Sequence, residues 1–355
     1  MSLRVAIIAD DLTGALDSSV GFAMHGMRTR VAVTADAIGT ALADDPEVLA
    51  INTASRPLPP EAAAAAVRDA AQQLPARSTL VFKKIDSRLK GNVAVETAAM
   101  AAMVRALRIV VAPAVPDQQR LVKDGRVVGR GVAAPIAVAP VFEGLGLPVS
   151  VADAETRGDL DALVARGLAA DTLFVGASGL AKALARAIGG PLQRYSFQPD
   201  GETLFVLGSR DAITRDQIEV LTTTYPELSV AVLPAAGAET ALPSRLPALL
   251  RPPSELVASP DEVSARLADM AAEAVARLHP ATLVLGGGDT ALAVLDRLGA
   301  KLLAPVGEPI LGMVEVTVTV SGRPLRCLVK SGGFGNVDAL VGLVESGPVA
   351  RVAGG

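Results

Sequence analysis

The stretch from Arg4 to Ala15 constrains the fold of this chain most. Its apolar residues Val5–Ala9 form an unbroken run, which is typical of a strand buried on both faces of a parallel sheet. Two adjacent carboxylates, Asp10 and Asp11, end the run, and small residues in a helical pattern follow. In doubly wound sheets ligands bind outside the carboxyl ends of strands, so both carboxylates stand where a site is expected. Alternatively, one Asp caps the helix and the other is solvated.

Length and composition indicate two α/β domains. The chain has 355 residues, of which 50% are apolar but only 3% aromatic, as expected for helices packed on buried sheets. Turn-forming residues gather at 189–201, which favours a boundary there. We therefore predict an α/β protein with a domain over 1–195 and another over 196–355. Each is expected to have a largely parallel sheet flanked by helices, with the ligand cleft between the two domains.

Charge and composition disfavour several classes of function. The net charge is −4 without a basic block, which disfavours nucleic-acid binding. No apolar stretch approaches the roughly 20 residues that span a bilayer, and the N-terminal apolar run is too short for a signal peptide. We therefore expect a cytoplasmic chain without a membrane partner. The sequence leaves the oligomeric state open, and a homo-oligomer is compatible with it.

Few residues suit histidine or cysteine chemistry. The chain has two histidines, His25 and His279, each at an expected helix end, and a single cysteine, Cys327, in an apolar strand pattern. So few histidines and cysteines disfavour serine–histidine hydrolysis, histidine-rich zinc sites and an internal disulfide framework. Acid–base chemistry would then depend on Asp, Glu, Lys or Tyr, and no metal ligands are identified.

A cationic stretch, residues 83–92, follows a short strand predicted over Thr79–Phe82. A helix is predicted next, over Val93–Arg105. Cations between a strand and a helix suit a carboxylate or phosphate, because the helix N-terminus adds its own positive end. The alternative is a solvated, salt-bridged loop. The candidate substrate ligands in this stretch are Lys83, Lys84, Asp86 and Arg88.

Three glycine loops in the second half each follow a predicted strand. Their backbone N–H groups are unobstructed by side chains, so together they predict a phosphate-binding rim. None matches the dinucleotide fingerprint or the P-loop pattern, and each could also serve backbone geometry alone. The candidate ligands are Ser209, Gly287, Gly288, Asp289, Thr290, Lys330, Ser331, Gly332 and Gly333.

The remaining elements are predicted from periodicity and turn residues. A loop or hairpin is expected over 116–138, and residues 235–259 are not assigned. Strands are predicted at 30–34, 48–52, 108–112, 148–152, 172–175, 203–207, 229–233, 282–285, 313–320 and 325–330. Helices are predicted at 61–73, 158–165, 180–188, 215–223, 261–278, 291–298 and 337–345.

Four segments together resemble the four-carbon acid sugar kinase family, which includes D-threonate and 3-oxo-tetronate kinases. They occur in the family's order and span nearly the whole chain: Asp10–Ala15, Lys83–Asn92, Gly287–Thr290 and Lys330–Gly335. The resemblance implies an N-terminal domain that binds the sugar acid and a C-terminal domain that binds ATP, with Mg²⁺ needed for transfer. Carried over, the residues facing the acid are Asp10, Arg56, Lys84, Asp86 and Arg88, and those facing ATP are Ser209, Gly287–Thr290 and Gly332.

The chain also departs from the family pattern. Arg88 stands where the family usually has threonine or a similar small residue, and Lys90 where it usually has arginine. The central segment 113–120, commonly a proline–glycine–arginine loop, is altered, and the chain is shorter than most members. The family assignment stands, while the particular acid sugar is left open.

The leading hypothesis is an ATP-dependent kinase that phosphorylates a hydroxyl of a short acid sugar. Asp10 or Asp86 serves as base or orienting group, the cations bind the carboxylate, and the glycine loops bind the phosphates. The second hypothesis is a sugar-acid and nucleotide-binding regulatory protein without turnover. A nicotinamide-linked dehydrogenase is disfavoured by the missing fingerprint.

Overall fold

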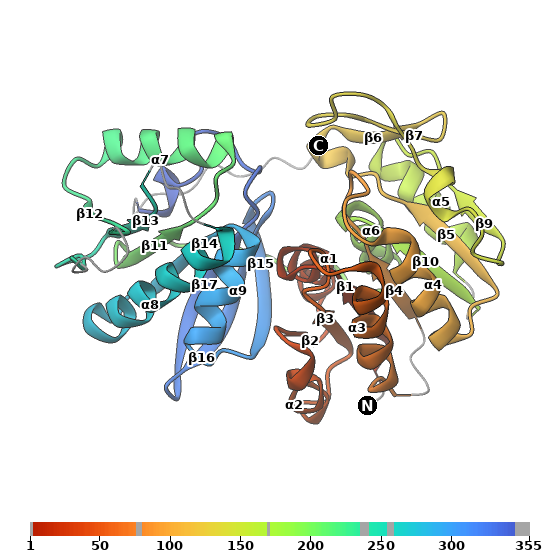
Figure 1. The fold of residues 1–355 in the computed structure, drawn as a ribbon, viewed down its shortest axis with the longest axis horizontal. Coiled ribbons are helices and arrows are strands. Elements are labelled where there is room, and N and C mark those ends of the chain that lie inside the picture. Colours follow the sequence, from red (N-terminus) through yellow and green to blue (C-terminus); the bar gives the residue numbers. More distant parts are fainter. Residues whose placement is uncertain (1–2, 76–79, 169–170, 235–240, 254–258, 345–355) are drawn as a thin grey trace. The chain divides into compact units, whose positions relative to one another are not determined.

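The computed structural model describes residues 3–75, 80–168, 171–234, 241–253 and 259–344. The chain divides into two compact units, Met1–Arg194 and Tyr195–Gly355 (Figure 1). Each unit contains a mostly parallel sheet with helices on both faces, so the predicted fold class is confirmed. The two units are described in turn.

The N-terminal unit is built on a parallel sheet in the order β2-β3-β1-β4-β10-β5-β9. Strand β1 is buried along its whole length and pairs with β3 on one side and β4 on the other, as its apolar run predicts. The strands are β1 (Val5–Ala9), β2 (Thr29–Ala32), β3 (Val48–Asn52), β4 (Leu80–Lys84), β5 (Arg108–Ala112), β9 (Val149–Val151) and β10 (Thr172–Gly176).

Helices cover both faces of this sheet. On one face α1 packs against α6 and α6 against α5, and on the other α3 packs against α4. From β1 the chain turns toward β2, whereas from β4 it turns toward β5, so the adjacent ends of β1 and β4 form a topological switch point. The helices are α1 (Leu12–Met24), α2 (Ile38–Ala43), α3 (Pro60–Gln72), α4 (Val93–Val104), α5 (Arg157–Gly167) and α6 (Ser178–Ile188).

The segment after β5 forms the predicted hairpin. Strands β6 (Arg120–Lys123), β7 (Arg126–Gly129) and β8 (Ile136–Ala137) make a small antiparallel sheet. Short 3₁₀ helices stand on either side of it, at Pro116–Gln118 and Ala139–Phe142, and a further one, Ala35–Ala37, precedes α2.

The C-terminal unit has a mixed sheet in the order β12-β13-β11-β14-β17-β16-β15. Its first five strands in that order are parallel, and β16 and β15 are antiparallel. From β11 the chain turns toward β12, but from β14 it turns toward β15, which makes a second switch point. The strands are β11 (Thr203–Leu207), β12 (Ser229–Val232), β13 (Ala248–Arg251), β14 (Thr282–Gly286), β15 (Leu302–Ile310), β16 (Met313–Val320) and β17 (Arg323–Lys330).

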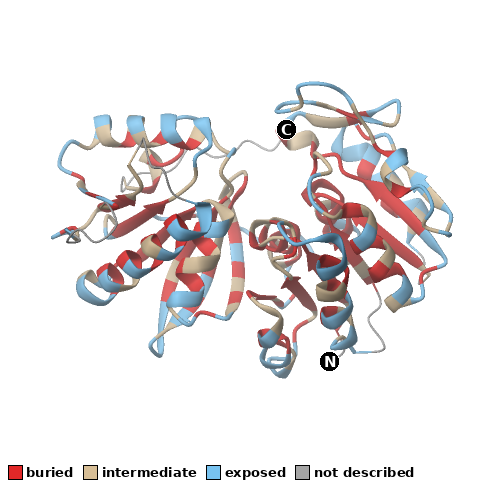
Figure 2. Ribbon diagram, in the orientation of Figure 1, coloured by how far each residue is buried: buried red, intermediate tan, exposed pale blue. Residues whose placement is uncertain are grey.

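Helices α8 (Pro260–Leu278) and α9 (Gly288–Arg297) pack together on one face of the second sheet. Helix α7 (Ala212–Thr224) and the 3₁₀ helix Val341–Leu343 cover the other. Between the sheet and α7 lies an apolar core that includes Phe205, Leu221 and Leu328. Figure 2 shows both sheets buried beneath helices whose outer sides are exposed.

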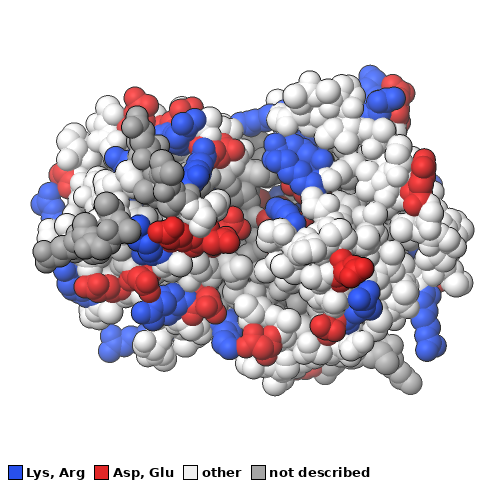
Figure 3. All heavy atoms as spheres, viewed as in Figure 1, with Lys and Arg blue, Asp and Glu red and all other residues white. Residues whose placement is uncertain are grey.

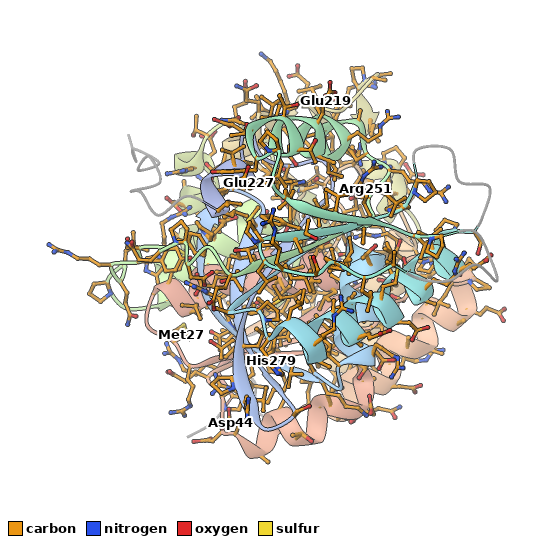
Figure 4. The ribbon with its side chains drawn as sticks, turned by 90° about the vertical axis from the view of Figure 1, so that its left-hand side faces the viewer. Met27, Asp44, Glu219, Glu227, Arg251 and His279 are labelled. Carbon is orange, nitrogen blue, oxygen red and sulfur yellow. The ribbon has the colours of Figure 1, made fainter. Side chains whose placement is uncertain are left out.

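Local signals explain several helix boundaries. Asp11 caps α1, Thr156 and Asp159 form a capping box at α5, and Ser259 caps α8 ahead of a proline. His25 is the C-cap of α1, as the sequence predicts. His279, labelled in Figure 4, is likewise the C-cap of α8. Cys327 is fully buried, and burial raises the pKa of its thiol.

Some predicted elements are wrong in extent. The predicted strand ends at Phe82, but β4 runs to Lys84, because both lysines find partners inside the unit. Thr79 lies outside the described residues. Strand β15 is absent from the sequence prediction, because its prolines and its glycine interrupt the alternating apolar pattern of a strand. In place of the predicted helix over 337–345, the described part has turns and a 3₁₀ helix at Val341–Leu343.

The surface carries charges of both signs. On the face seen in Figure 3, acidic and basic side chains are interspersed over each unit, consistent with the net charge of −4. Within the described residues no helix combines the length and the apolar character needed to cross a bilayer.

Candidate functional site

At the carboxyl end of β1, Asp10 and Asp11 share one guanidinium. Arg56 donates from Nε and Nη2 to the two oxygens of Asp10, at 2.7 and 2.8 Å, and from Nη1 to Asp11 at 2.8 Å. Burial tends to raise the pKa of Asp10, but the hydrogen bonds from Arg56 and nearby positive charges outweigh it, so that pKa lies below its ordinary value. Asp10 is therefore an ionised acceptor.

Asp11 also caps helix α1. Its side chain accepts from the Gly14 backbone N–H at 2.9 Å and from the Thr13 hydroxyl at 2.7 Å. The capping role considered from the sequence is thus real for Asp11, while the other acid, Asp10, is buried and paired rather than solvated. Arg56 binds both carboxylates, and the start of α1 binds Asp11 in addition.

Lys84 points from β4 into the same group of acids. Its amine lies 3.8 Å from Asp17 on α1. Burial tends to lower the pKa of Lys84, but Asp17, Asp11 and Asp10 outweigh it, so the pKa is raised and the ammonium persists. Asp17 is not among the predicted site residues, although it lies one helical turn beyond Gly14 and shares its face of α1.

Lys83 is turned away from this group, because successive strand residues face opposite sides of a sheet. Its amine is fully buried, pairs with Glu96 at 2.7 Å, and donates to the Lys84 carbonyl at 2.8 Å. Glu96 also accepts from the Ser55 hydroxyl at 2.7 Å. Lys83 therefore supports the sheet and α4 from within, an arrangement that disfavours its predicted contact with substrate.

The loop after β4 brings Asp86 next to the acids. One Asp86 oxygen accepts from the backbone N–H of Arg88 at 2.8 Å, and Asp86 acts electrostatically on Arg56. Gly91 has φ of +86°, and a Cβ there would lie 3.3 Å from Asp10 and 3.2 Å from Arg56. The loop therefore packs closely over the Asp10–Arg56 pair, and Gly91 permits that approach.

The same loop is joined by Arg120 from the hairpin, a residue that is not among the predicted site residues. Arg120 donates to the Ser87 hydroxyl at 2.5 Å. Arg88 extends toward the hairpin and donates to the Gly131 carbonyl at 3.4 Å. The sequence places Arg120 within the altered central segment, and its proximity to Arg88 follows only from the fold of the hairpin.

In the C-terminal unit the three glycine loops converge at the ends of β11, β14 and β17. A Cβ on Gly332 would lie 2.6 Å from the Ser209 hydroxyl, and one on Gly287 would lie 3.3 Å from Ser209 Cβ. The Gly287 N–H donates to the Lys330 carbonyl at 3.0 Å. Gly287 has φ of +100°, a conformation that side chains oppose.

Helix α9 begins at this convergence. Gly288 and Asp289 begin its first turn, and Asp289 is exposed there. Thr290 is buried against Gly208, where a side chain would clash with the Thr290 hydroxyl. The helix N-terminus thus faces a region where glycines keep the backbone accessible, an arrangement that suits an anionic phosphate.

Lys330 supports the last glycine loop from beneath. Its amine donates to the carbonyls of Ser331 and Gly332 at 3.1 and 2.9 Å and to the Thr214 hydroxyl at 3.3 Å. Burial lowers the pKa of Lys330 to about 8, with Asp211 opposing the shift. Because all three donors are engaged within the unit, this arrangement disfavours the predicted contact of Lys330 with the nucleotide.

Helix α7 secures the same loop from the other side. Thr214 donates to the Gly332 carbonyl at 2.8 Å, and Gln217 donates to the carbonyls of Phe334 and Asn336 at 3.0 and 2.8 Å. Glu219 lies on the outward, exposed side of the helix (Figure 4). In the part of the chain that the structure describes, no group of three His, Cys, Asp or Glu side chains suits a metal.

Comparisons with known proteins agree with this division. Residues 5–142 match the family model described as a sugar-binding N-terminal domain, and residues 204–340 match a nucleotide-binding C-terminal domain. A D-threonate kinase of Bordetella bronchiseptica is 33% identical, over 95% of this chain and 96% of its own length. A 3-oxo-tetronate kinase of Methylobacterium radiotolerans is 29% identical, over 95% of this chain and 98% of its own.

A solved structure supports the fold. A Haemophilus influenzae protein aligns over 96% of this chain and 100% of its own, with a TM-score of 0.67 and 20% identity. The two family models match the two halves in order, and the kinases match nearly the full length. The chain therefore belongs to the four-carbon acid sugar kinase family, with an N-terminal sugar-binding domain and a C-terminal nucleotide-binding domain.

Proposed function

We propose that this chain is an ATP-dependent kinase that phosphorylates a hydroxyl of a four-carbon acid sugar, such as a threonate, an erythronate or a 3-oxo-tetronate. One observation carries the proposal. In this chain, acids and cations lie at the switch point of the N-terminal sheet, and glycine loops with accessible backbone N–H groups lie at the switch point of the C-terminal sheet. Phosphoryl transfer needs both, because it depends on positioning and on neutralising charge.

In the proposed reaction Asp10 and Asp86 have different roles. Arg56 engages both oxygens of Asp10, which suits that ionised carboxylate to orienting a hydroxyl. One oxygen of Asp86 accepts backbone N–H groups, and among the described residues the other accepts no hydrogen bond. We therefore assign the role of proton acceptor to Asp86. The proton passes from the sugar hydroxyl to Asp86 as the hydroxyl oxygen bonds to the γ-phosphorus and the bond between that phosphorus and ADP breaks.

The glycine loops would bind the phosphates of ATP through backbone N–H groups, with Ser209, Gly287–Thr290 and Ser331–Gly333 around them. Mg²⁺ would neutralise the phosphates. It commonly uses one or two carboxylates besides phosphate oxygens, so a cluster of protein ligands is not required. Asp289 is exposed in the first turn of α9, and Asp211 lies beside Gly333, so both fit that role.

The proposal is tested by ADP release from ATP and Mg²⁺ with a panel of four-carbon acid sugars. We expect one ADP for each phosphorylated acid, and about a 10²- to 10⁴-fold lower kcat in Asp86→Asn. That variant should still be stabilised thermally by the acid, since Asp10 and Arg56 remain. Glu219→Gln, on the exposed side of α7, is the control. Stabilisation by ligands without ADP release in the unaltered chain would instead support the binding or regulatory protein.

A further inference from the structure

Two arginines from separate segments meet above the Asp86 loop. Arg88 comes from that loop and Arg120 from the start of β6. A Cβ on Gly131 would lie 3.2 Å from Nη2 of Arg120 and 3.8 Å from Nη1 of Arg88, so both guanidiniums border the same glycine. Arg120 Nε also donates to the Arg130 carbonyl at 3.1 Å. Hydrogen bonds to the neighbouring carbonyls of Arg130 and Gly131 thus hold the two guanidiniums beside each other.

Little negative charge offsets this pair. Burial lowers the pKa of Arg120, and the positive charges of Arg88 and Arg130 lower it further, with Asp86 opposing them. Among the described residues neither Arg88 nor Arg120 forms an ion pair, and the buried Nε of Arg88 has no hydrogen-bond partner. An unpaired donor and like charges side by side are costly, and an anion would relieve both costs.

The pair lies next to the proposed reaction centre. Asp86 acts electrostatically on both Arg56 and Arg120, and Gly91 of the same loop packs against Asp10. The acids Asp10, Asp11 and Asp86 suit hydroxyl groups, whereas a carboxylate would be repelled by them. A short acid sugar therefore finds acceptors for its hydroxyls beside donors for its carboxylate.

We propose that Arg88 and Arg120 form an anion subsite for the substrate carboxylate, and that Arg88 sets the preference for acids over neutral sugars. This inference rests on the proposed kinase function. It assigns the carboxylate to two planar guanidiniums, which can bind it through paired N–H donors, rather than to Lys83 or Lys84, whose amines are engaged by protein carboxylates.

The test compares the preferred acid sugar with its carboxamide, which is neutral. In Arg88→Met we expect the KM for the acid to rise about 10- to 100-fold, with kcat within about threefold and the reaction of the carboxamide unchanged. Arg88→Lys, which keeps the charge but not the paired donors, should give an intermediate KM. Arg126→Met removes an exposed arginine of the same hairpin and should behave as the unaltered chain.

A binding experiment without ATP separates this inference from the kinase proposal. Malonate should raise the melting temperature of the full chain and should do so less in Arg88→Met. Equal losses for acid and carboxamide, or no change in either, would overturn the role of Arg88. Stabilisation by inorganic phosphate but not by malonate would overturn the carboxylate assignment. Failure of every acid sugar to release ADP, with the malonate response intact, would overturn the kinase function and leave the anion subsite standing.

Discussion

At the scale of single residues, the N-terminal site depends on which side chains are already paired. Arg56 holds Asp10 and Asp11 together, and Lys84 lies among three acids. Lys83, one residue earlier, is bonded to Glu96 in the interior. Neighbouring lysines thus have different roles, because a strand directs successive side chains to opposite faces.

Lys83 should matter for stability rather than for substrate binding. Lys83→Met leaves the buried Glu96 unpaired, so we expect a loss of about 3–5 kcal/mol in the free energy of unfolding, measured by urea denaturation. The double variant with Glu96→Gln should recover part of that loss and show a KM near that of the unaltered chain. A Lys83→Met variant with unchanged stability and a raised KM would instead support a contact of Lys83 with the substrate.

At the scale of elements, glycines decide how closely loops and helix ends approach the sites. Gly14 lies against Lys84 in the first turn of α1, Gly91 covers Asp10 and Arg56, and Gly287 turns from β14 into α9. In each place a Cβ would meet a neighbouring side chain, and at Gly91 and Gly287 the backbone also has positive φ.

Gly14→Ala should damage the site more than the fold. Its Cβ would overlap the Asp11 carboxylate and lie 2.7 Å from the Lys84 amine, both of which are ends of flexible side chains that can shift. We therefore expect a KM for the acid sugar at least about tenfold higher, with a small change in melting temperature. Gly39→Ala in α2, with no atom within 4 Å of the added Cβ, is the control and should stabilise slightly.

Lys330 should make the stability of the C-terminal unit depend on pH. Its pKa is about 8 in the folded chain and near 10.5 when unfolded, so between these values the unfolded state binds more protons. Stability should therefore rise with pH across that window, by at most about 1.4 kcal/mol per pH unit from this group.

Urea denaturation at pH 7.5 and 9.5 checks the role of Lys330. Relative to Lys330→Met, the unaltered chain should gain stability at the higher pH. Lys123→Met, which replaces a lysine with a 59% exposed side chain, should show no such change. A difference between the unaltered chain and Lys330→Met that is the same at both pH values would contradict the assigned contacts.

At the scale of the whole molecule, the proposed kinase needs both domains in one reactive complex. The acid sugar would bind at the switch point between β1 and β4, and the nucleotide at that between β11 and β14. Transfer requires the two ligands to come within bonding distance, so binding at one domain should favour binding at the other.

Isothermal titration measures this coupling. We expect a non-hydrolysable ATP analogue with Mg²⁺ to tighten binding of the acid sugar by about 5- to 150-fold, and the acid to tighten binding of the analogue by the same factor. Equal affinities with and without the second ligand would show that the domains bind independently and would weaken the kinase proposal. Arg126→Met again provides a control outside the proposed sites.

Sequence alone determined most of the parallel strands and the chemical division of the chain. The run Val5–Ala9, the acids after it and the glycine loops are local patterns, and local patterns fix burial and backbone freedom. Only the tertiary structure decided which cations are available. Lys83 pairs with Glu96, Lys330 turns beneath its own loop, and Arg120 reaches Arg88 from a hairpin. Those outcomes depend on contacts between distant residues, which no local pattern records.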